Sequence, residues 1–261
     1  MDILYLDTLS GISGNMFLGA LIDLGFDINV LKKELAKLPL EGYTIEIAPA
    51  VKKGISCTFL DVNIDWEYFS PKKRTEQTFP KDIFRVLMES ELSPFVKQNS
   101  IEAFEKNIAA KTKIFNTSKD KIHFNSVELI DTYIDIVGAC TAVESLSPKK
   151  IQASAVHVGT GHFKSRHGTR IIPDPVVLEI FKSRNIPIHS TDIRGQLVTI
   201  TGACILAQLV DEFCPMNFEV KNIGYGCGSS DFAIPNVLRV IEGTQLQSKN
   251  KFVCEGKDRE R

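Results

Sequence analysis

The pattern of hydrophobic and polar positions along the chain predicts a mixture of strands and helices. Residues 3–6 form a short apolar run typical of a buried strand, and residues 57–64 alternate as in a half-buried strand. Residues 28–38 place their leucines on one stripe, which predicts an amphipathic helix. Further helices are predicted from the 10–14 turn to Gly25 and at 80–90, 94–113, 127–146, 175–184 and 199–212; further strands are predicted at 43–48, 186–189, 218–223 and 236–242, with two more within 151–175.

The order of these elements shows no repeat, which favours an α/β or mixed α+β fold with a mixed sheet packed against helices. A seam near 115–150 divides the chain into two candidate lobes, 1–115 and 116–246. The polar stretch 65–79 is expected to be a solvated connector, and the polar segment 247–261 a disordered tail.

Composition excludes several classes of protein. The 31 Lys and Arg residues are balanced by 32 Asp and Glu, so there is no broad basic field for nucleic acid. No apolar run approaches the ~20 residues that span a bilayer. The first residues lack a cationic segment, and none of the six cysteines are spaced as Cys-x-x-Cys. We therefore expect a cytoplasmic protein with reduced thiols, no membrane segment and no nucleic-acid partner.

The turn after the first strand is a candidate anion site. Asp7 is followed by Ser10, Gly11, Ser13 and Gly14, and a helix then begins. Backbone N–H groups in such a turn can accept a phosphate or a carboxylate. The glycine spacing matches neither the Rossmann nor the P-loop pattern, and a tight turn with Ser13 as helix N-cap is the alternative.

Two aspartates lie on one face of the apolar helix 127–146. Asp131 and Asp135 are separated by one helical turn, and His123 precedes the helix. Carboxylates on an apolar helix indicate a metal or general-base site, or a buried polar network. A solvated helix edge is the alternative.

All five histidines lie within 123–189, and the first 122 residues contain none. His157, His162 and His167 are five residues apart, and three imidazoles this close suit Ni²⁺ or Zn²⁺. His167 is the strongest candidate of the three, although a histidine in such a segment can equally serve as a capping or packing residue.

Two further stretches could contact a ligand. Thr199, Thr201 and Gly202 open a helix, where threonine hydroxyls either cap the helix or donate to an anion. The glycine-rich stretch 224–231 is expected to be a loop whose glycines permit positive φ angles and close backbone approach, either to a ligand or as a structural turn.

Taken in order, these stretches resemble the nickel insertion protein (LarC-type) family, and the resemblance covers most of the chain. The segments that carry it are Tyr5-Leu6-Asp7, Ser10–Gly14, Met16–Leu21, His123-Phe124, Asp131, Asp135–Gly138, Gly159–Gly161, His167-Gly168, Leu197–Thr199, Thr201–Ala203, Gly224–Gly226 and Asn236–Arg239.

The resemblance implies a cytoplasmic chelatase of the lyase class, or metallochaperone. It would load nickel onto a pyridinium bis-thiocarboxylate mononucleotide, which becomes the nickel-pincer cofactor of lactate racemase. Family members depend on CTP, with Mg²⁺ or Mn²⁺, bound by a C-terminal half absent from this chain, so a partner chain or a readthrough product is expected. The oligomeric state, including a homo-oligomer, is left open. The implied metal ligands are His123, Asp131 and His167; the implied catalytic residues are Asp7 and Asp135; the implied ligand contacts are Ser10, Gly11, Ser13, Gly14, Thr199, Thr201 and Gly202.

The chain also departs from the family pattern. The family has aspartate, histidine, glutamate and glutamate at the positions of Asn15, Asn125, Ser126 and Gln196, and glycine at Glu128. Amides and hydroxyls bind Ni²⁺ more weakly than carboxylates and imidazoles do. The family's histidine-rich insert near 65–80 is also missing, and His157 and His162 are not family positions.

These departures support a second hypothesis, a non-catalytic ligand-binding or scaffolding paralogue with a decayed metal site. A third, a phosphate-binding hydrolase that uses Asp7 and the following turn, is disfavoured because no Lys or Arg is placed near that turn.

Overall fold

The computed structural model describes residues 1–165 and 168–246 and confirms the α/β class. Its centre is a mixed seven-stranded sheet in the order β11-β6-β1-β13-β12-β3-β2. β1 pairs parallel with β6 and antiparallel with β13, and β12 pairs parallel with β3. The strands are β1 (Ile3–Asp7), β2 (Tyr43–Lys52), β3 (Ile55–Ile64), β6 (Lys150–Ala153), β11 (Glu212–Phe213), β12 (Phe218–Cys227) and β13 (Val237–Gln245).

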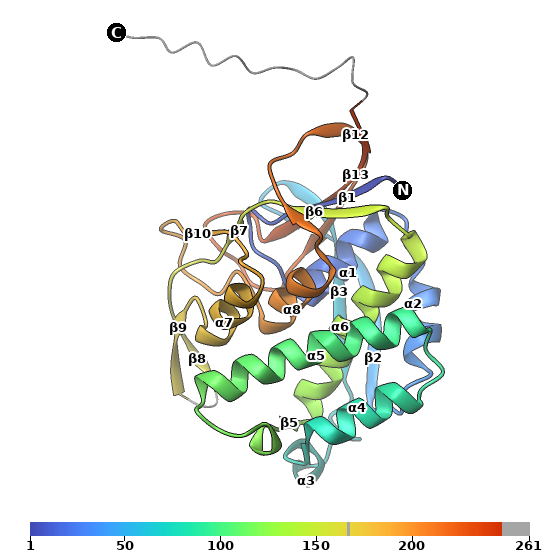
Figure 1. Ribbon diagram of the computed structural model, residues 1–261, viewed down its shortest axis with the longest axis vertical. Helices are drawn as coiled ribbons and strands as arrows, with labels where there is room; N and C mark the ends of the chain where they lie inside the picture. Colours follow the sequence, from blue (N-terminus) through green and yellow to red (C-terminus); the bar gives the residue numbers. More distant parts are fainter. Residues whose placement is uncertain (166–167, 247–261) are drawn as a thin grey trace.

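The helices begin and end close to the predicted positions. They are α1 (Gly14–Asp23), α2 (Ile28–Leu35), α3 (Pro71–Arg74), α4 (Pro80–Glu89), α5 (Pro94–Ile114), α6 (Ser126–Leu146), α7 (Pro175–Ser183) and α8 (Ile200–Leu209), with a short 3-10 turn η1 (Lys119–Lys121). Figure 1 shows α5 crossing the molecule in front of α6, and α5 also packs against α7 and α8. Three small sheets complete the fold: β4 (Gln77–Thr78) with β5 (Phe124–Asn125), β7 (Val156–His157) with β10 (Ile188–His189), and the hairpin of β8 (Gly161–Ser165) and β9 (Gly168–Ile172).

The main core lies between the sheet and the helices. Alternation along β1 directs Leu4 and Leu6 into this core, while Tyr5 on the opposite face packs against Phe218. Strands from residues 1–115 and from residues 116–246 share the one seven-stranded sheet. The main core likewise contains side chains from both candidate lobes.

The prediction of a loop at 224–231 was wrong for residues 224–227, which belong to β12. Gly224 and Gly226 lie within β12, and neither has a positive φ. A Cβ at Gly226 would lie 1.9 Å from the carbonyl oxygen of Met16, and one at Gly224 would lie 2.1 Å from that of Ala20. These glycines therefore lack a side chain so that α1 can pack directly on the sheet.

Two smaller differences concern element boundaries. The connector 65–79 contains α3 and β4 rather than only loop, and the helix predicted to reach residue 212 ends at Leu209. No helix within 1–165 and 168–246 has the length and apolar character needed to span a bilayer. The predicted tail at 247–261 lies outside the described residues.

Candidate functional site

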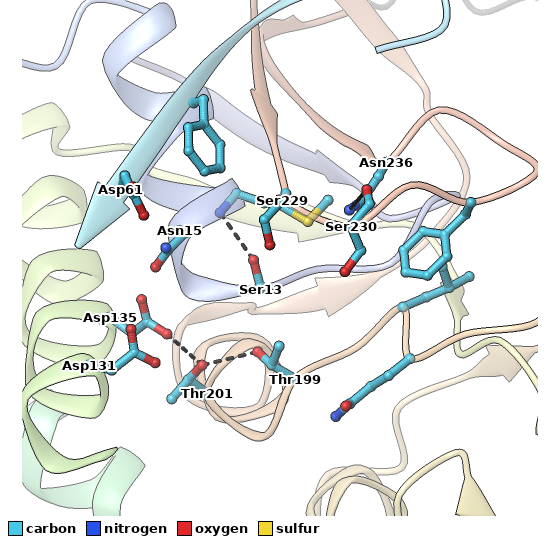
Figure 2. A pocket seen from close by; sticks show the side chains of 16 residues that line it. Ser13, Asn15, Asp61, Asp131, Asp135, Thr199, Thr201, Ser229, Ser230 and Asn236 are labelled. Atoms are coloured by element: carbon cyan, nitrogen blue, oxygen red, sulfur yellow. Dashed lines mark hydrogen bonds between the residues drawn. The ribbon is translucent and has the colours of Figure 1, made fainter. Parts of the chain in front are cut away.

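A pocket of about 230 Å³ opens where the N-terminal ends of α1 and α8 approach α6 and β3 (Figure 2). We call it the carboxylate pocket, because three aspartates line it and no Lys or Arg among the described residues does. Its lining residues are Ser13, Asn15, Met16, Phe59, Asp61, Asp131, Asp135, Gln196, Leu197, Thr199, Thr201, Gly228, Ser229, Ser230, Phe232 and Asn236.

Asp131 and Asp135 lie side by side on α6 and face Thr201 (Figure 2). The prediction that they share one helix face is confirmed. Asp135 is only 3% exposed; one carboxylate oxygen accepts a 2.6 Å hydrogen bond from the Thr201 hydroxyl, and the other has no partner among the described residues. Asp131 is exposed at the pocket mouth. The pair therefore joins a solvent-accessible carboxylate to a buried one.

The environment favours protonation of both aspartates. Burial raises the pKa of Asp135 well above its usual range; the negative charge of Asp131 adds to this effect, and the hydrogen bond from Thr201 opposes it. Loss of surrounding water and then the charge of Glu128 raise the pKa of Asp131, less strongly because this carboxylate reaches solvent. A divalent cation would favour the ionised form of both groups, so metal binding and proton release are linked.

The start of α1 is shaped to accommodate Asp135. Ser13 is the N-cap, and its hydroxyl accepts a hydrogen bond from the Met16 N–H, as the alternative interpretation of this turn proposed. A Cβ on Gly14, the next residue, would lie 1.9 Å from the Asp135 carboxyl carbon. Gly14 therefore gives the carboxylate room beside the positive end of the helix.

The threonines that open α8 both cap the helix and line the pocket. Thr199 is the N-cap and accepts from the Gly202 N–H at 3.0 Å, and its hydroxyl lies 3.0 Å from that of Thr201. A Cβ at Gly202 would lie 2.4 Å from the carbonyl oxygen of Ile12, so this glycine allows α8 to approach the first turn.

Asp7, Ser10 and Gly11 do not line the carboxylate pocket. Asp7 is 4% exposed and forms an ion pair with Arg239 on the neighbouring strand. The Gly11 N–H donates to the Thr8 carbonyl, and a Cβ at Gly11 would lie 2.0 Å from the Leu197 carbonyl oxygen. The first part of the turn thus packs against residues 197–198, and only Ser13 of the predicted anion turn reaches the pocket.

His123 is not brought to the pocket either. It is exposed, its ring packs near Phe79, and its Nδ1 lies 3.2 Å from the Lys121 carbonyl oxygen. His167 lies outside the described residues.

The other histidines of the predicted trio have separate environments. His157 is buried; its Nδ1 lies 3.0 Å from the Leu9 carbonyl oxygen, its Nε2 lies 3.0 Å from the Thr191 hydroxyl, and its ring stacks on His189. His162 is exposed on the β8–β9 hairpin. His157 and His162, the two described members of the trio, therefore belong to no group of metal-ligating side chains among the described residues.

The four departures from the family pattern separate into two groups. Asn15 and Gln196 line the pocket, and their amide nitrogens donate to the carbonyls of Leu60 and Val198. Asn125 instead caps α6 and hydrogen-bonds to Glu128, and Ser126 donates to the carbonyl of Lys73. Only the first two substitutions therefore change the chemistry of the pocket directly.

Several pocket residues escaped prediction as site residues. Asp61 and Phe59 project from β3, and their alternation in the sequence is the only signal that they share a strand face. Ser229 and Ser230, by contrast, belong to the glycine-rich stretch that the sequence singled out as a possible ligand loop.

The donor set is sparse for a metal. In the part of the chain that the structure describes, no three His, Cys, Asp or Glu side chains are grouped to hold an ion. The pocket offers the Asp131 and Asp135 carboxylates, with the neutral oxygens of Asn15 and Gln196 nearby. Two carboxylates with neutral oxygens suit a loosely held divalent cation rather than a permanent one.

Comparisons with known proteins agree on one family. A family model described as nickel insertion protein matches residues 4–257. Pyridinium-3,5-bisthiocarboxylic acid mononucleotide nickel insertion proteins are similar: that of Clostridium kluyveri is 40% identical (95% of this chain, 64% of that protein), that of Desulfitobacterium hafniense 38% (96% and 60%), and that of Staphylococcus saprophyticus 36% (94% and 61%). The chain thus spans about three fifths of these relatives. No solved structure matches it significantly.

Proposed function

Because the chain belongs to the nickel insertion protein family, we propose that it holds Ni²⁺ in the carboxylate pocket and delivers it to a pyridinium bis-thiocarboxylate mononucleotide. The relatives' names mention this mononucleotide together with nickel insertion. The nickel is cargo, so the site has to bind it and then release it.

One observation carries the proposal: the buried Asp135 has an unpartnered carboxylate oxygen beside the accessible Asp131. Ni²⁺ arrives at Asp131 from solvent and then binds Asp135, whose proton leaves for water. The amide oxygens of Asn15 and Gln196 can add weak ligands. Thiocarboxylate sulfur is a softer donor than these oxygens, so transfer of nickel to the mononucleotide is favourable.

The rest of the lining suits a pyridinium ring. Phe59 and Phe232 supply aromatic surface, and Asp61 supplies a further negative charge. A cationic ring is attracted both to aromatic faces and to carboxylates. The same pocket can therefore hold the ring while the metal lies at Asp131 and Asp135.

The wider proposal concerns the complete protein. The relatives are longer than this chain, and we assign CTP, with Mg²⁺ or Mn²⁺, to a C-terminal half that acts with this chain as a nickel chelatase. The cytoplasm is the compartment we propose, and the five described cysteines, all free thiols, fit a reducing environment.

Calorimetric titration of the purified chain with Ni²⁺ tests the proposal. The wild-type chain is expected to bind one equivalent, and Asp131→Asn and Asp135→Asn to weaken binding at least about tenfold, which corresponds to loss of ~1.4 kcal/mol. Asp120→Asn, an exposed aspartate outside the pocket, is the matched control and should bind as the wild type does. Absence of binding by the wild-type chain, or equal binding by all variants, would overturn the assignment of nickel to this pocket.

A further inference from the structure

A second cavity of about 230 Å³ adjoins the carboxylate pocket and differs from it in charge. Two cationic side chains, Lys111 and Arg170, line it. We propose that this second cavity binds the phosphate end of the mononucleotide whose pyridinium end occupies the carboxylate pocket; this inference rests on the proposed function. The residues common to the two cavities are Asp131, Gln196, Thr199 and Thr201.

Arg170 retains donors for an anion. It extends from β9, is partly buried, and bonds Asp174 through one terminal nitrogen at 3.1 Å. Asp174 is itself 3% exposed and caps α7, so it fixes the guanidinium against the cavity wall. The remaining N–H groups of Arg170 have no hydrogen-bond partner in residues 1–165 and 168–246. A guanidinium with free donors is well suited to a phosphate.

Lys111 supplies the second positive charge from α5. It is only 7% exposed, its ammonium lies 3.1 Å from a Glu128 carboxylate oxygen, and it lies 3.9 Å from the centre of the Phe124 ring. These contacts hold the ammonium in one place. In the described parts of the chain the ammonium makes one hydrogen bond, to Glu128, which leaves ammonium hydrogens available.

Asn107 gives an independent indication that the second cavity receives a polar ligand. Its side chain is 2% exposed, lines the cavity, and has an amide oxygen without a hydrogen-bond partner among the described residues. An unpaired buried acceptor is costly, and a ligand hydroxyl would satisfy it. A ribose carries such hydroxyls beside its phosphate, which favours a nucleotide over a free phosphate ion.

The charges of the second cavity couple phosphate binding there to nickel binding in the carboxylate pocket. Glu128 and Asp174 are each paired with a cation, whereas Asp131 has no ion-pair partner among the residues that the structure describes. Asp131 would repel a phosphate until a divalent cation neutralises it. Nickel at the carboxylate pocket should therefore strengthen phosphate binding, and by reciprocity the phosphate should strengthen nickel binding.

Two commercially available probes, nicotinic acid mononucleotide and the corresponding riboside without phosphate, test the inference with the full chain. We expect the mononucleotide to bind at least about tenfold more tightly than the riboside. This ratio should increase with Ni²⁺ present, fall to near unity in Arg170→Gln, and be largely kept in Arg170→Lys. Lys113→Gln removes a charge from the same helix outside both cavities and should leave the ratio unchanged.

The outcomes separate this inference from the proposed function. A wild-type ratio near unity, or a high ratio that survives in Arg170→Gln, would reject the phosphate site. If Arg170→Gln does not fold, the same affinity ratio is measured in Lys111→Gln, where it should fall; an unchanged ratio would reject the phosphate site. Nickel titration of Lys113→Gln without nucleotide should match the wild type. A wild-type chain that binds no nickel but still discriminates the two probes would reject the proposed function and leave the phosphate site intact.

Discussion

The Thr201 hydroxyl donates a 2.6 Å hydrogen bond to Asp135, which joins the first turn of α8 to the middle of α6. The same carboxylate lies against Gly14 at the start of α1. Helix N-termini carry partial positive charge, so Asp135 lies near two favourable dipole ends. This arrangement explains how a carboxylate can be retained within an apolar helix.

Asp135→Asn is expected to stabilise the metal-free chain near neutral pH. An unfolded aspartate loses its proton near pH ~4, whereas burial raises the pKa of folded Asp135. Folding stability therefore falls as pH rises through the interval between the two values, because the unfolded state gives up its proton first. Asparagine removes this penalty, and we expect a gain of about 1–2 kcal/mol at about pH 7.5.

Thermal melts at two pH values measure this effect. The gain should shrink as pH falls toward ~4 and disappear below about pH 3, where the carboxyl is protonated in both states. Asp131→Asn is the comparison, and because Asp131 reaches solvent its gain should be smaller. A lower melting temperature for Asp135→Asn at about pH 7.5 would contradict the account of Asp135 as a functional residue kept at the expense of stability.

Gly14→Ala is expected to displace the Asp135 carboxylate. The added methyl would lie 1.9 Å from the carboxyl carbon, and the short buried side chain has little room to move. We expect a loss of about 1–3 kcal/mol of stability and nickel binding weakened as in Asp135→Asn. Gly138→Ala, whose methyl would meet only flexible leucine side chains, is the matched control and should leave nickel binding unchanged. Equal effects in both variants would argue against a specific role for Gly14.

Asp7 and Arg239 should contribute to stability rather than to metal binding. They lie directly opposite each other on β1 and β13, and the Arg239 Nε donates to Asp7 at 2.9 Å. Arg239→Met leaves a buried carboxylate unpaired and is expected to cost about 2–4 kcal/mol. Asp7→Asn should cost less, because the arginine side chain left behind is 38% exposed. Urea unfolding measures the free energy of unfolding of both variants. If Asp7→Asn folds but binds nickel less tightly, Asp7 has the catalytic role that the family resemblance implied.

The sequence predicted most of the fold because helix caps and hydrophobic periods are local signals. Ser93 caps α5 directly before Pro94, a combination typical of a helix start, and the apolar run 3–6 predicted β1. Gly226 shows where this reasoning fails. A glycine can be required either because its φ is positive or because another part of the backbone lies too close for a side chain. Only the packing of α1 on β12 shows that the close contact is the reason at Gly226.

The candidate site was predictable only in part, because local sequence signals do not show which distant residues pack together. The spacing of Asp131 and Asp135 placed them on one helix face without the structure. His123 was grouped with them because it precedes the helix, yet nine residues of helix rise separate Ser126 from Asp135, which is about 14 Å. Asp61 comes from a distant strand, and its proximity depends on tertiary packing that no local pattern encodes.

His189 should make the chain less stable in mild acid. Burial, and then the neighbouring His157, lower its pKa, and the two rings are stacked 4.8 Å apart. As pH falls below about 6.5, the unfolded histidine takes up a proton that the folded one does not, so stability is lost in that range. His189→Gln should show a smaller fall in melting temperature between about pH 7.5 and 5.5, whereas His162→Gln, at an exposed site, should behave as the wild type. Parallel melting curves for the wild type and His189→Gln would refute this assignment.

Asn15→Asp is expected to strengthen nickel binding. Asn15 lines the pocket with Asp61, Asp131 and Asp135, and its amide oxygen has no partner among the described residues. A carboxylate there adds a charged ligand, and we expect binding about tenfold tighter, or ~1.4 kcal/mol. The metal-free variant should lose about 1 kcal/mol of stability, because the Asn15 hydrogen bond to Leu60 disappears. Asn15→Ala, which removes the same hydrogen bond without adding charge, should not tighten binding. Calorimetry on both variants decides, and unchanged affinity in Asn15→Asp would mean that the metal does not lie within reach of this side chain.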